Sequence, residues 1–197
     1  MTIKRLEQQI QFIIEIDKLK QVVRQTYITD ASRRENSVEH SWHLAMMAMV
    51  LAEHANDSDI DLSRVIKMVL IHDIVEIDAG DTFLYDDKRT ESKSERELAA
   101  ADRLFNLLPA DQADIFRKLW DEFEARQTKD AKFAFVLDRF QPVLHNVITK
   151  GKAWREHGVK KFQVIGKNSP MQEGSASLWE YISDLLDYSV EEGYLSK

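Results

Sequence analysis

Residues 69–77 form an apolar run that carries His72 and Asp73 side by side, with Glu76 three residues further on. Such a run is expected to be buried, and burial of an unpaired carboxylate is costly because the ion loses its water. The pair therefore needs a hydrogen-bond partner, an ion-pair partner or a metal ion. A His-Asp pair by itself is more often a satisfied structural pair, so other residues of the chain have to decide between these roles.

Two further ionisable residues lie in apolar helical patterns elsewhere in the chain. His40 lies within residues 38–55, and Asp138 lies within residues 131–148. Two imidazoles and two carboxylates form a mixed nitrogen and oxygen ligand set, which suits a divalent metal ion. The sequence therefore predicts a single buried metal site that three helices build. His145 leaves a second ion open, but the chain lacks the extra histidine cluster that a two-metal site would use.

Apolar residues recur at helical spacing along almost the whole chain, which predicts an all-α fold without a β-hairpin. Asn36, with Glu39 three residues later, has the spacing of a capping box and marks the start of a central helix that is apolar almost all round. Thr128 is placed to cap the helix of Asp138, and Pro142 is expected to kink that helix or end its regular part. The predicted helices span residues 3–24, 38–55, 62–78, 93–108, 111–126, 131–148 and 175–190.

The length and the charge of the chain limit its possible functions. With 44% apolar residues, residues 1–197 are expected to form one domain. A net charge of -7 argues against nucleic-acid polymers as partners, because they require a concentrated basic face. The chain has no cysteine, which excludes disulfides and cysteine-ligated metal sites. We recognise neither a signal peptide nor a membrane-spanning stretch, so we expect no membrane partner and a cytoplasmic protein.

Glu76 and Asp81 are the candidates for activating a water molecule beside the metal ion. Glu76 comes four residues after His72, so on a helix its carboxylate falls on the same side. Asp81 follows Gly80, where the helix is expected to end, and can reach the same place from a loop. A metal ion makes its bound water more acidic, and a nearby carboxylate can orient or deprotonate that water. The combination indicates a hydrolase, while the structural alternative for Glu76 is an ion pair with an arginine such as Arg139.

The order of these motifs, each on its own helix, resembles the HD-domain metal-dependent phosphohydrolases. The run of residues 72–81 and the pair Asp121-Glu122 look like the branch that contains the bacterial 5′-deoxynucleotidases and related nucleotidases. The resemblance covers roughly residues 5–150 and implies an HD-domain helical bundle with a metal-binding core at about residues 24–150. Carried over residue by residue, it implies that the metal ligands are His40, His72, Asp73 and Asp138.

The resemblance also implies roles for the residues around the metal ion. Glu76 and Asp81 would engage the catalytic water, Arg24 would hold the substrate phosphate, and Glu122 would lie near the nucleoside end of the pocket. In the deoxynucleotidases a tryptophan follows the phosphate-binding arginine and helps to exclude a ribose 2′-hydroxyl, whereas Gln25 follows Arg24 here. This departure opens two questions.

The first question is sugar selectivity. Gln25 does not exclude a ribose 2′-hydroxyl as a bulky ring does, so ribonucleotides are expected to be accepted. The alternative is that another residue, such as Tyr27 or Trp42, takes the place of the tryptophan. The second is which arginine holds the phosphate. Arg33 and Arg34, shortly before His40, are alternative anion binders, and either can equally be a solvated loop charge.

The sequence thus predicts a metal-dependent phosphomonoesterase of the 5′-nucleotidase type that acts on nucleoside or deoxynucleoside 5′-monophosphates. Its cofactor is expected to be one divalent ion, with Mn, Co, Fe, Ni or Zn suiting the ligands better than Mg. The alternatives are hydrolysis of another phosphorylated metabolite or signalling nucleotide, and a nucleotide-sensing protein without turnover. A homodimer is expected through the last helix, at about residues 175–190, whose aromatic side chains can instead pack on the core.

Overall fold

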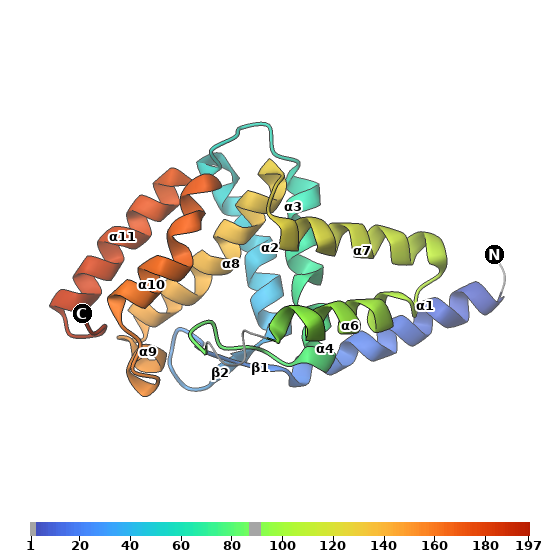
Figure 1. Cartoon of the computed structure of the whole chain (residues 1–197), viewed down its shortest axis with the longest axis horizontal. Helices are drawn as coiled ribbons and strands as arrows, with labels where there is room; N and C mark the ends of the chain where they lie inside the picture. The colour runs from blue at the N-terminus through green and yellow to red at the C-terminus, as the bar shows by residue number, and fades with distance from the viewer. Residues whose placement is uncertain (1–2, 87–91) are drawn as a thin grey trace.

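Helices dominate the computed structural model, which describes residues 3–86 and 92–197 (Figure 1). The all-α prediction is confirmed for this part of the chain, apart from one short pair of strands. The α-helices are α1 (Ile3–Ile16), α2 (Ser37–Leu51), α3 (Leu62–Ile71), α4 (Glu76–Ala79), α6 (Lys93–Phe105), α7 (Ala110–Ala125), α8 (Lys129–Ile148), α9 (Lys152–Glu156), α10 (Lys161–Asn168) and α11 (Ala176–Glu191). The 3-10 helices are η1 (Asp17–Gln21), η2 (Ala52–His54), η3 (His72–Val75) and η4 (Ser169–Glu173), and the strands are β1 (Val23–Tyr27) and β2 (Arg34–Asn36).

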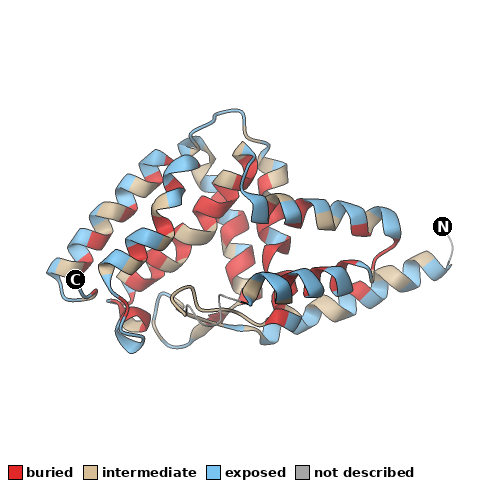
Figure 2. Cartoon of the chain, viewed as in Figure 1, coloured by how far each residue is buried: buried red, intermediate tan, exposed pale blue. Residues whose placement is uncertain are grey.

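The core lies around α8, which runs through the middle of the molecule and packs against α2, α3, α7 and α11 (Figures 1 and 2). Leu44 of α2, Met68 of α3 and Phe133 and Leu137 of α8 are fully buried. Burying a large apolar side chain contributes on the order of 1.5–3 kcal/mol relative to leaving it exposed. The three helices that carry the predicted metal ligands are therefore also the ones that the core holds in place.

The helix α2 begins as predicted but is buried on one side only. Asn36 accepts a hydrogen bond from the backbone N–H of Glu39, whose side chain accepts one from the backbone of Asn36, so the capping box is confirmed. The buried face carries His40 and Leu44, while Trp42 and Val50 on the opposite side are 62% and 67% exposed. Apolar composition all round the helix therefore does not mean burial all round.

Residues 23–36 form an antiparallel pair of strands, which corrects the prediction of an all-helical chain without a hairpin. The first helix ends at Ile16 rather than near Arg24, and η1 follows it. The strands pair with a bulge or irregularity between Val23 and Tyr27, and the turn between them contains Ala31 at a φ of 59°. Because this turn has no glycine and the strands no regular polar and apolar alternation, the sequence carried no hairpin signal. The hairpin places Arg24, which is on β1, next to β2 and beside the core.

The predicted helix over residues 62–78 is divided at the His72-Asp73 pair. α3 ends at Ile71, η3 has 3-10 geometry, and α4 ends at Ala79, where Gly80 follows with a φ of 72°. A 3-10 helix has about three residues per turn, so that residues three apart lie on one face. Asp73 and Glu76 are three residues apart, so the tighter winding turns both carboxylates toward the same side.

The helix α8 passes through Pro142 without ending. Its cap is confirmed, since Thr128 accepts a hydrogen bond from the N–H of Ala131. The helix continues past Pro142 to Ile148, and the Asn146 side chain donates a 2.9 Å hydrogen bond to the Pro142 carbonyl. The expectation that Pro142 ends the regular part is therefore wrong. Proline lacks an N–H group, so the loss is one hydrogen bond to the carbonyl of Asp138, and the surrounding packing tolerates it.

The C-terminal part contains two helices that the sequence did not reveal, α9 and α10, and the predicted last helix. α11 packs on α8 and η4 through Leu178, Ile182 and Leu186, at the end of the molecule opposite to α1 (Figure 1). Tyr181 and Tyr188 remain 52% and 46% exposed, and the homodimer stays a prediction. None of the described helices has the length and apolar character that crossing a membrane requires.

Candidate metal centre

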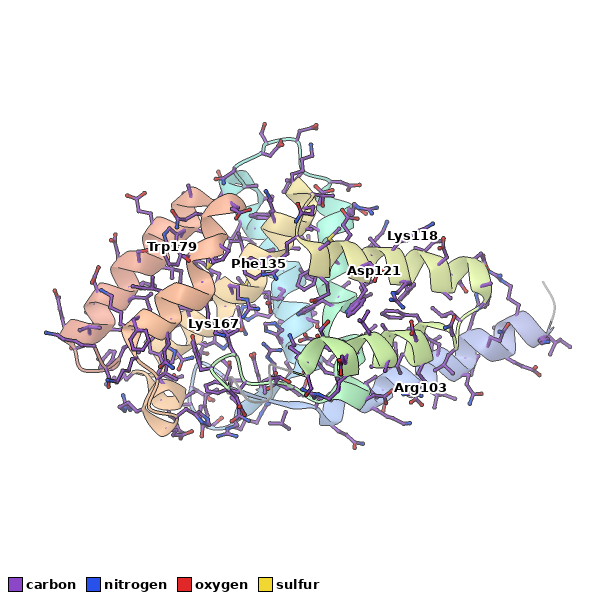
Figure 3. All side chains as sticks on the ribbon, viewed as in Figure 1. Arg103, Lys118, Asp121, Phe135, Lys167 and Trp179 are labelled. Carbon is purple, nitrogen blue, oxygen red and sulfur yellow. The ribbon has the colours of Figure 1, made fainter. Side chains whose placement is uncertain are left out.

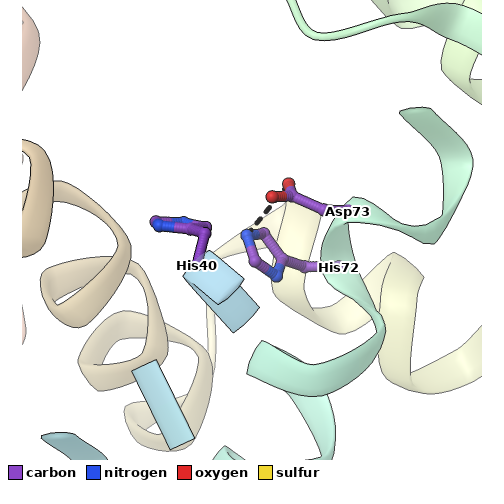
Figure 4. A group of neighbouring side chains, drawn as sticks. All are labelled: His40, His72 and Asp73. Carbon is purple, nitrogen blue, oxygen red and sulfur yellow. Dashed lines mark ion pairs between the residues drawn. The ribbon is translucent and has the colours of Figure 1, made fainter. Parts of the chain in front are cut away.

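Four ionisable side chains from three parts of the chain meet inside the bundle. His40 comes from α2, His72 and Asp73 from η3, and Asp138 from α8. His40 Nε2 lies 3.0 Å from Asp138 Oδ1, and His72 Nε2 lies 3.0 Å from Asp73 Oδ1 and 3.5 Å from Asp138 Oδ1. One ligand atom each from His40, His72 and Asp73 lies within 4.8 Å of the others, and Figure 4 shows the His40 imidazole beside the other pair.

The two histidines present the same ring nitrogen to the centre. His72 Nδ1 donates a 2.9 Å hydrogen bond to the carbonyl of Val69, one helical turn earlier. His40 Nδ1 lies 3.2 Å from Gln141 Oε1, an acceptor. Both Nδ1 atoms are thus held by acceptors outside the centre, which leaves both Nε2 atoms facing the carboxylates.

The residues present fit a divalent metal ion. His72 Nε2 is buried and has no hydrogen-bond partner within the described residues, as a nitrogen reserved for a ligand would be. His40, His72 and Asp73 are 0%, 6% and 7% exposed, so an ion here would be held with little competition from water. Two imidazole nitrogens with two carboxylates suit Mn, Fe, Co, Ni or Zn.

Burial and mutual contact set the charges of these groups. Burial lowers the pKa of His40 to about 4, and Arg24 acts in the same direction, so this imidazole is neutral. Burial also opposes the charged form of His72, but Asp73 and Asp138 outweigh it and raise the pKa to about 10. Burial would raise the pKa values of both carboxyl groups, yet their contacts with the histidines and with arginines hold them below the usual range. The two carboxylates are therefore ionised and attract a cation.

Glu76 and Asp81 line the same cavity as three of the predicted ligands. Glu76 is 6% exposed, and its Oε2 accepts a 2.7 Å hydrogen bond from the Ser37 hydroxyl at the start of α2. Burial raises the pKa of Glu76, and the nearby Asp73 carboxylate adds to the effect. Arg139 is not its partner, since that side chain lies against Asp138 and Phe135 instead. Glu76 thus lines the cavity beside the predicted ligands and is not half of an ion pair with Arg139.

Of the three arginines considered for the phosphate, Arg24 is the one that lines the cavity. Its Nη1 donates a 2.8 Å hydrogen bond to Asp73 Oδ2, and its Nε lies 3.4 Å from Glu35 Oε1. Arg33 is paired with Glu39 at 2.7 Å on the surface. Arg34 lies outside the cavity as well, 3.5 Å from Glu156 and over the ring of Tyr27.

The cavity has a volume of about 330 Å³ and is lined by the predicted ligands His72, Asp73 and Asp138 and by residues of loops and helix ends. Gln25 of β1 lines it, next to Arg24, as the resemblance to the nucleotidases implied. The loop after α4 contributes Phe83 and Tyr85. The helix α6 contributes Lys93 and Glu97, whose Nζ and Oε1 atoms are 3.3 Å apart. The cavity therefore combines a charged end with a partly aromatic opening.

Three residues that the sequence had placed at or near this site lie elsewhere. Glu122 pairs with Arg64 and accepts a 2.6 Å hydrogen bond from Thr128, outside the cavity lining. Tyr27 donates its hydroxyl to Glu156, 2.9 Å away, and Trp42 is 62% exposed on α2. Neither ring therefore takes the place of the missing tryptophan beside Gln25.

Two residues at the site were missed by sequence reasoning, and a third, Arg139, was considered only as an ion-pair partner of Glu76. Glu35 of β2 is 2% exposed and contacts Arg24, and burial raises its pKa to about 7 against the opposing effects of Arg24 and Gln141. Gln141 of α8 contacts His40, and its position three residues after Asp138 was the one signal for it in the sequence. Arg139 lines the cavity, and its buried Nε has no hydrogen-bond partner among the described residues.

His145 adds no further group of metal ligands in the described residues. Its Nδ1 donates a 3.1 Å hydrogen bond to the carbonyl of Tyr27, and its ring lies 5.4 Å from that of His43. Burial lowers the pKa of His145 to about 4, so the ring is a neutral link between α8 and the hairpin. The single metal site stays a prediction.

Comparison with known proteins bears on the whole chain. A family model described as "HD domain" matches residues 16–179. A crystal structure described as "Predicted metal-dependent phosphohydrolase from Magnetospirillum magnetotacticum MS-1" is 53% identical, with a TM-score of 0.93 over 98% of this chain and 96% of that one. The PH0347 protein from Pyrococcus horikoshii OT3 shares the fold at 20% identity, with a TM-score of 0.61 over 93% of this chain and 99% of that one.

Curated relatives match a shorter part. Human 5′-deoxynucleotidase HDDC2 is 32% identical over 136 residues, which are 68% of this chain and 65% of that protein. The 5′-deoxynucleotidase hdd1 of Schizosaccharomyces pombe is 24% identical over 163 residues, 80% of each chain. The match to human HDDC2 thus spans slightly less than two thirds of that protein's length.

Proposed function

The chain belongs to the HD-domain family, and from this premise we propose that it is a metal-dependent phosphohydrolase that removes the phosphate from nucleoside or deoxynucleoside 5′-monophosphates. One observation carries the proposal: two histidines and two carboxylates converge at the buried end of a cavity that Glu76 and Arg24 also line. The names of the relatives, a 5′-deoxynucleotidase and a metal-dependent phosphohydrolase, support it.

His40, His72, Asp73 and Asp138 would hold one divalent ion. The two imidazoles favour Mn, Co, Fe, Ni or Zn over Mg, which prefers oxygen ligands throughout. When bound, such an ion supplies Lewis acidity at a phosphate oxygen and makes a water molecule more acidic. The chain's own residues must then orient the water, take its proton and neutralise the phosphate.

Glu76 is proposed to take the proton from the attacking water. The hydrogen bond from Ser37 holds one of its carboxylate oxygens, so the other is available to the water. A raised pKa makes the ionised carboxylate a stronger base. Asp81, half-buried in the loop after Gly80, is proposed to orient the same water. The water oxygen bonds to phosphorus, the bond from phosphorus to the 5′ oxygen breaks, and the proton that Glu76 took from the water passes to that oxygen, so that the nucleoside leaves as an alcohol.

Arg24 and Arg139 are proposed to face the charge of the phosphate. Charge persists on the phosphoryl oxygens through a loose transition state, and a guanidinium with two parallel N–H groups matches them. Arg24 reaches the cavity beside Asp73, and Arg139 reaches it beside Asp138, where its Nε lies 3.5 Å from Oδ2. The two cations therefore approach the predicted metal from two sides.

The open end of the cavity is proposed to take the nucleoside. A volume of about 330 Å³ is at the lower end of what small-molecule sites use, roughly 300–1,000 Å³. Phe83 and Tyr85, whose ring centroids are 5.2 Å apart, offer aromatic faces for a base. Gln25 is narrower than a tryptophan and can hydrogen-bond a 2′-hydroxyl, which supports acceptance of ribonucleotides as well.

The test is a substrate screen with the purified protein, loaded in turn with Mn, Co, Ni, Zn and Mg. We expect release of inorganic phosphate from ribo- and deoxyribonucleoside 5′-monophosphates, and much less from sugar phosphates or phosphodiesters. Asp138→Ala should lose the ion and the activity together, since both carboxylates are needed to balance it. Asp184→Ala, which removes an exposed aspartate of α11, is the matched control and should change neither.

Two results would contradict the proposal in different ways. Cleavage of a sugar phosphate or a phosphodiester with nucleotides untouched would make the protein a phosphohydrolase of another metabolite or signalling nucleotide. Tight nucleotide and metal binding without any turnover would make it a sensor, although binding alone does not require a water-activating carboxylate such as Glu76.

A further inference from the structure

Glu35 is a buried carboxylate outside the predicted set of metal ligands, and its Oε1 lies 3.7 Å from Nδ1 of the predicted ligand His40. It lies on β2, is 2% exposed, and is enclosed by β1 and α8. A carboxylate so far from water is retained only where several donors meet it. Its two oxygens must therefore be traced to their partners.

One oxygen of Glu35 fixes the side-chain amide of Gln141. Glu35 Oε2 accepts a 2.7 Å hydrogen bond from Gln141 Nε2. The two ends of an amide are hard to distinguish by shape, but a carboxylate accepts hydrogen bonds and does not donate them. The NH₂ group of Gln141 must therefore face Glu35, and its Oε1 must face the other way.

The amide oxygen of Gln141 in turn fixes the proton on His40. Gln141 Oε1 lies 3.2 Å from His40 Nδ1, and an acceptor at this position requires Nδ1 to carry the proton. His40 Nε2 then keeps its lone pair, 3.0 Å from Asp138 Oδ1. Hydrogen-bond donation thus runs from His40 Nδ1 to Gln141 and from Gln141 to Glu35, which leaves Nε2 as the ligand atom of His40.

The other oxygen of Glu35 faces the proposed phosphate-binding arginine. Oε1 lies 3.4 Å from Arg24 Nε, while Arg24 Nη1 reaches Asp73 Oδ2 at 2.8 Å. Glu35 thus faces the guanidinium as an ion pair without a hydrogen bond between these two atoms, and Arg24 also lines the cavity. His145 Nδ1, 4.0 Å from Glu35 Oε2, donates to the Tyr27 carbonyl and does not compete for the carboxylate.

We infer that Glu35 is a positioning residue that holds the metal-ligating tautomer of His40 through Gln141 and the orientation of Arg24 directly. The inference deepens the proposed function and rests on it for the role of Arg24. The part that concerns His40, called the metal arm below, can be tested by metal binding without a substrate. One carboxylate thereby links the metal site to the phosphate site. Partners of this kind behind a metal ligand typically change metal affinity about 10- to 100-fold when they are removed.

The test removes the obligatory acceptor next to His40 Nδ1 and then restores it. In Glu35→Gln the new amide can donate to Gln141, so Gln141 is free to turn its NH₂ group toward His40 Nδ1, which selects the wrong tautomer. In the double variant Glu35→Gln with Gln141→Glu, the amide at position 35 donates to the carboxylate at position 141, and that carboxylate is an obligatory acceptor next to His40 Nδ1. The net charge is that of the natural chain. Cobalt(II) binding is followed by calorimetry and by the visible absorption of the bound ion, at pH 8, where the Glu35 carboxylate is ionised.

We expect Glu35→Gln to weaken Co(II) binding by 10- to 100-fold and the double variant to return to within about threefold of the natural chain. Gln141→Leu removes the acceptor from the other side and should give the same loss as Glu35→Gln, so the inference does not depend on the folding of one variant. Glu156→Gln is the matched control, because Glu156 ties the outside of the same hairpin to α9 through Tyr27 and Arg34 and should leave Co(II) binding unchanged.

Unchanged Co(II) affinity in Glu35→Gln, or a double variant no better than the single one, would overturn the inference. If Glu35 had only a structural role, exchanging the residues at positions 35 and 141 would not restore Co(II) binding. For the role of Arg24, we expect Glu35→Gln to raise KM for a nucleotide, and part of this increase should persist when the variant is loaded with excess metal. If the natural chain binds Co(II) but cleaves no nucleotide, the proposed function fails while the metal arm of this inference remains measurable.

Discussion

The metal end of the cavity and its mouth are built from different parts of the chain. The metal end, formed by His40, His72, Asp73, Glu76 and Asp138, comes from the α-helices α2, α4 and α8 and the 3-10 helix η3, and four of these five residues are less than 8% exposed. The mouth, formed by Gln25, Phe83, Tyr85 and Arg126, comes from a strand, a loop and the end of α7, and its residues are half-buried or exposed. Under the proposed function, the chemistry would be held by the core, while selectivity would lie in the strand and loop residues at the mouth.

The energetic reason for the contrast is charge. Removing one partner from the metal end leaves a buried charge without compensation, which costs about 3–5 kcal/mol in a typical buried pair. A half-buried residue at the mouth is solvated after any change, and surface changes usually stay within about 0.5 kcal/mol. Substitutions at the two ends should therefore differ by orders of magnitude in their effect on turnover.

The largest effect is expected from Glu76→Gln. The amide keeps the hydrogen bond with Ser37 but cannot take a proton, so kcat should fall about 100-fold or more while metal content stays at one ion per chain. Steady-state kinetics and metal analysis measure the two quantities. Glu97→Gln is the matched control, since Glu97 is also buried in this cavity but is paired with Lys93, and we expect a loss below tenfold. Loss of metal with Glu76→Gln would make Glu76 a ligand, and equal losses in both variants would erase the contrast between the two glutamates.

An intermediate effect is expected at the two arginines that share the ring of Phe135, which is labelled in Figure 3. Arg139 lies 5.0 Å and Arg126 4.8 Å from the ring centroid, but Arg139 is beside Asp138 and Arg126 is exposed at the mouth. Arg139→Gln should raise KM about tenfold, the effect of losing one charge-assisted hydrogen bond of roughly 1.5 kcal/mol. Arg126→Gln should change KM less than about twofold. A larger effect of Arg126→Gln would move phosphate recognition to the mouth.

The metal end is also the part that sequence reasoning reached. His40, His72-Asp73 and Asp138 could be recognised because an ionisable residue in an apolar helix requires a reason. The division of the helix at His72 could not, because four residues are too few to separate a period of 3.0 from one of 3.6. Metal binding by these residues itself stays a prediction.

The rest of the site depends on contacts between residues far apart in sequence. Glu35 and Gln141 meet although 106 residues separate them, and nothing in the local pattern of either residue indicates the other. The hairpin that carries Arg24 and Glu35 lacks a glycine turn, so its strands depend on the side chains that bury them. Such features follow from tertiary packing, which a single sequence does not reveal.

The smallest effect concerns the sugar, at the mouth. Gln25 leaves room for a 2′-hydroxyl, so kcat/KM for a ribonucleoside monophosphate should lie within about tenfold of its deoxy counterpart, or roughly 1.4 kcal/mol of discrimination. Matched ribo and deoxy substrates at one saturating metal concentration give the ratio. Gln25→Trp should shift it toward deoxy substrates without changing metal content. A hundredfold deoxy preference in the natural chain would show that the mouth is more selective than its open structure suggests.

The distance along the chain between the ligands has a consequence for how the protein matures. His40 and Asp138 are 98 residues apart, so a nascent chain that has emerged only as far as α7 holds three of the four ligands but not the last. The centre can therefore form only after α8 has docked, late in synthesis, because long-range contacts are made after local ones. An ion that binds only the completed centre stabilises the folded chain by about 2.7 kcal/mol when present at 100 times its dissociation constant. Metal supply in the cell would then control how long the folded protein survives as well as how fast it works.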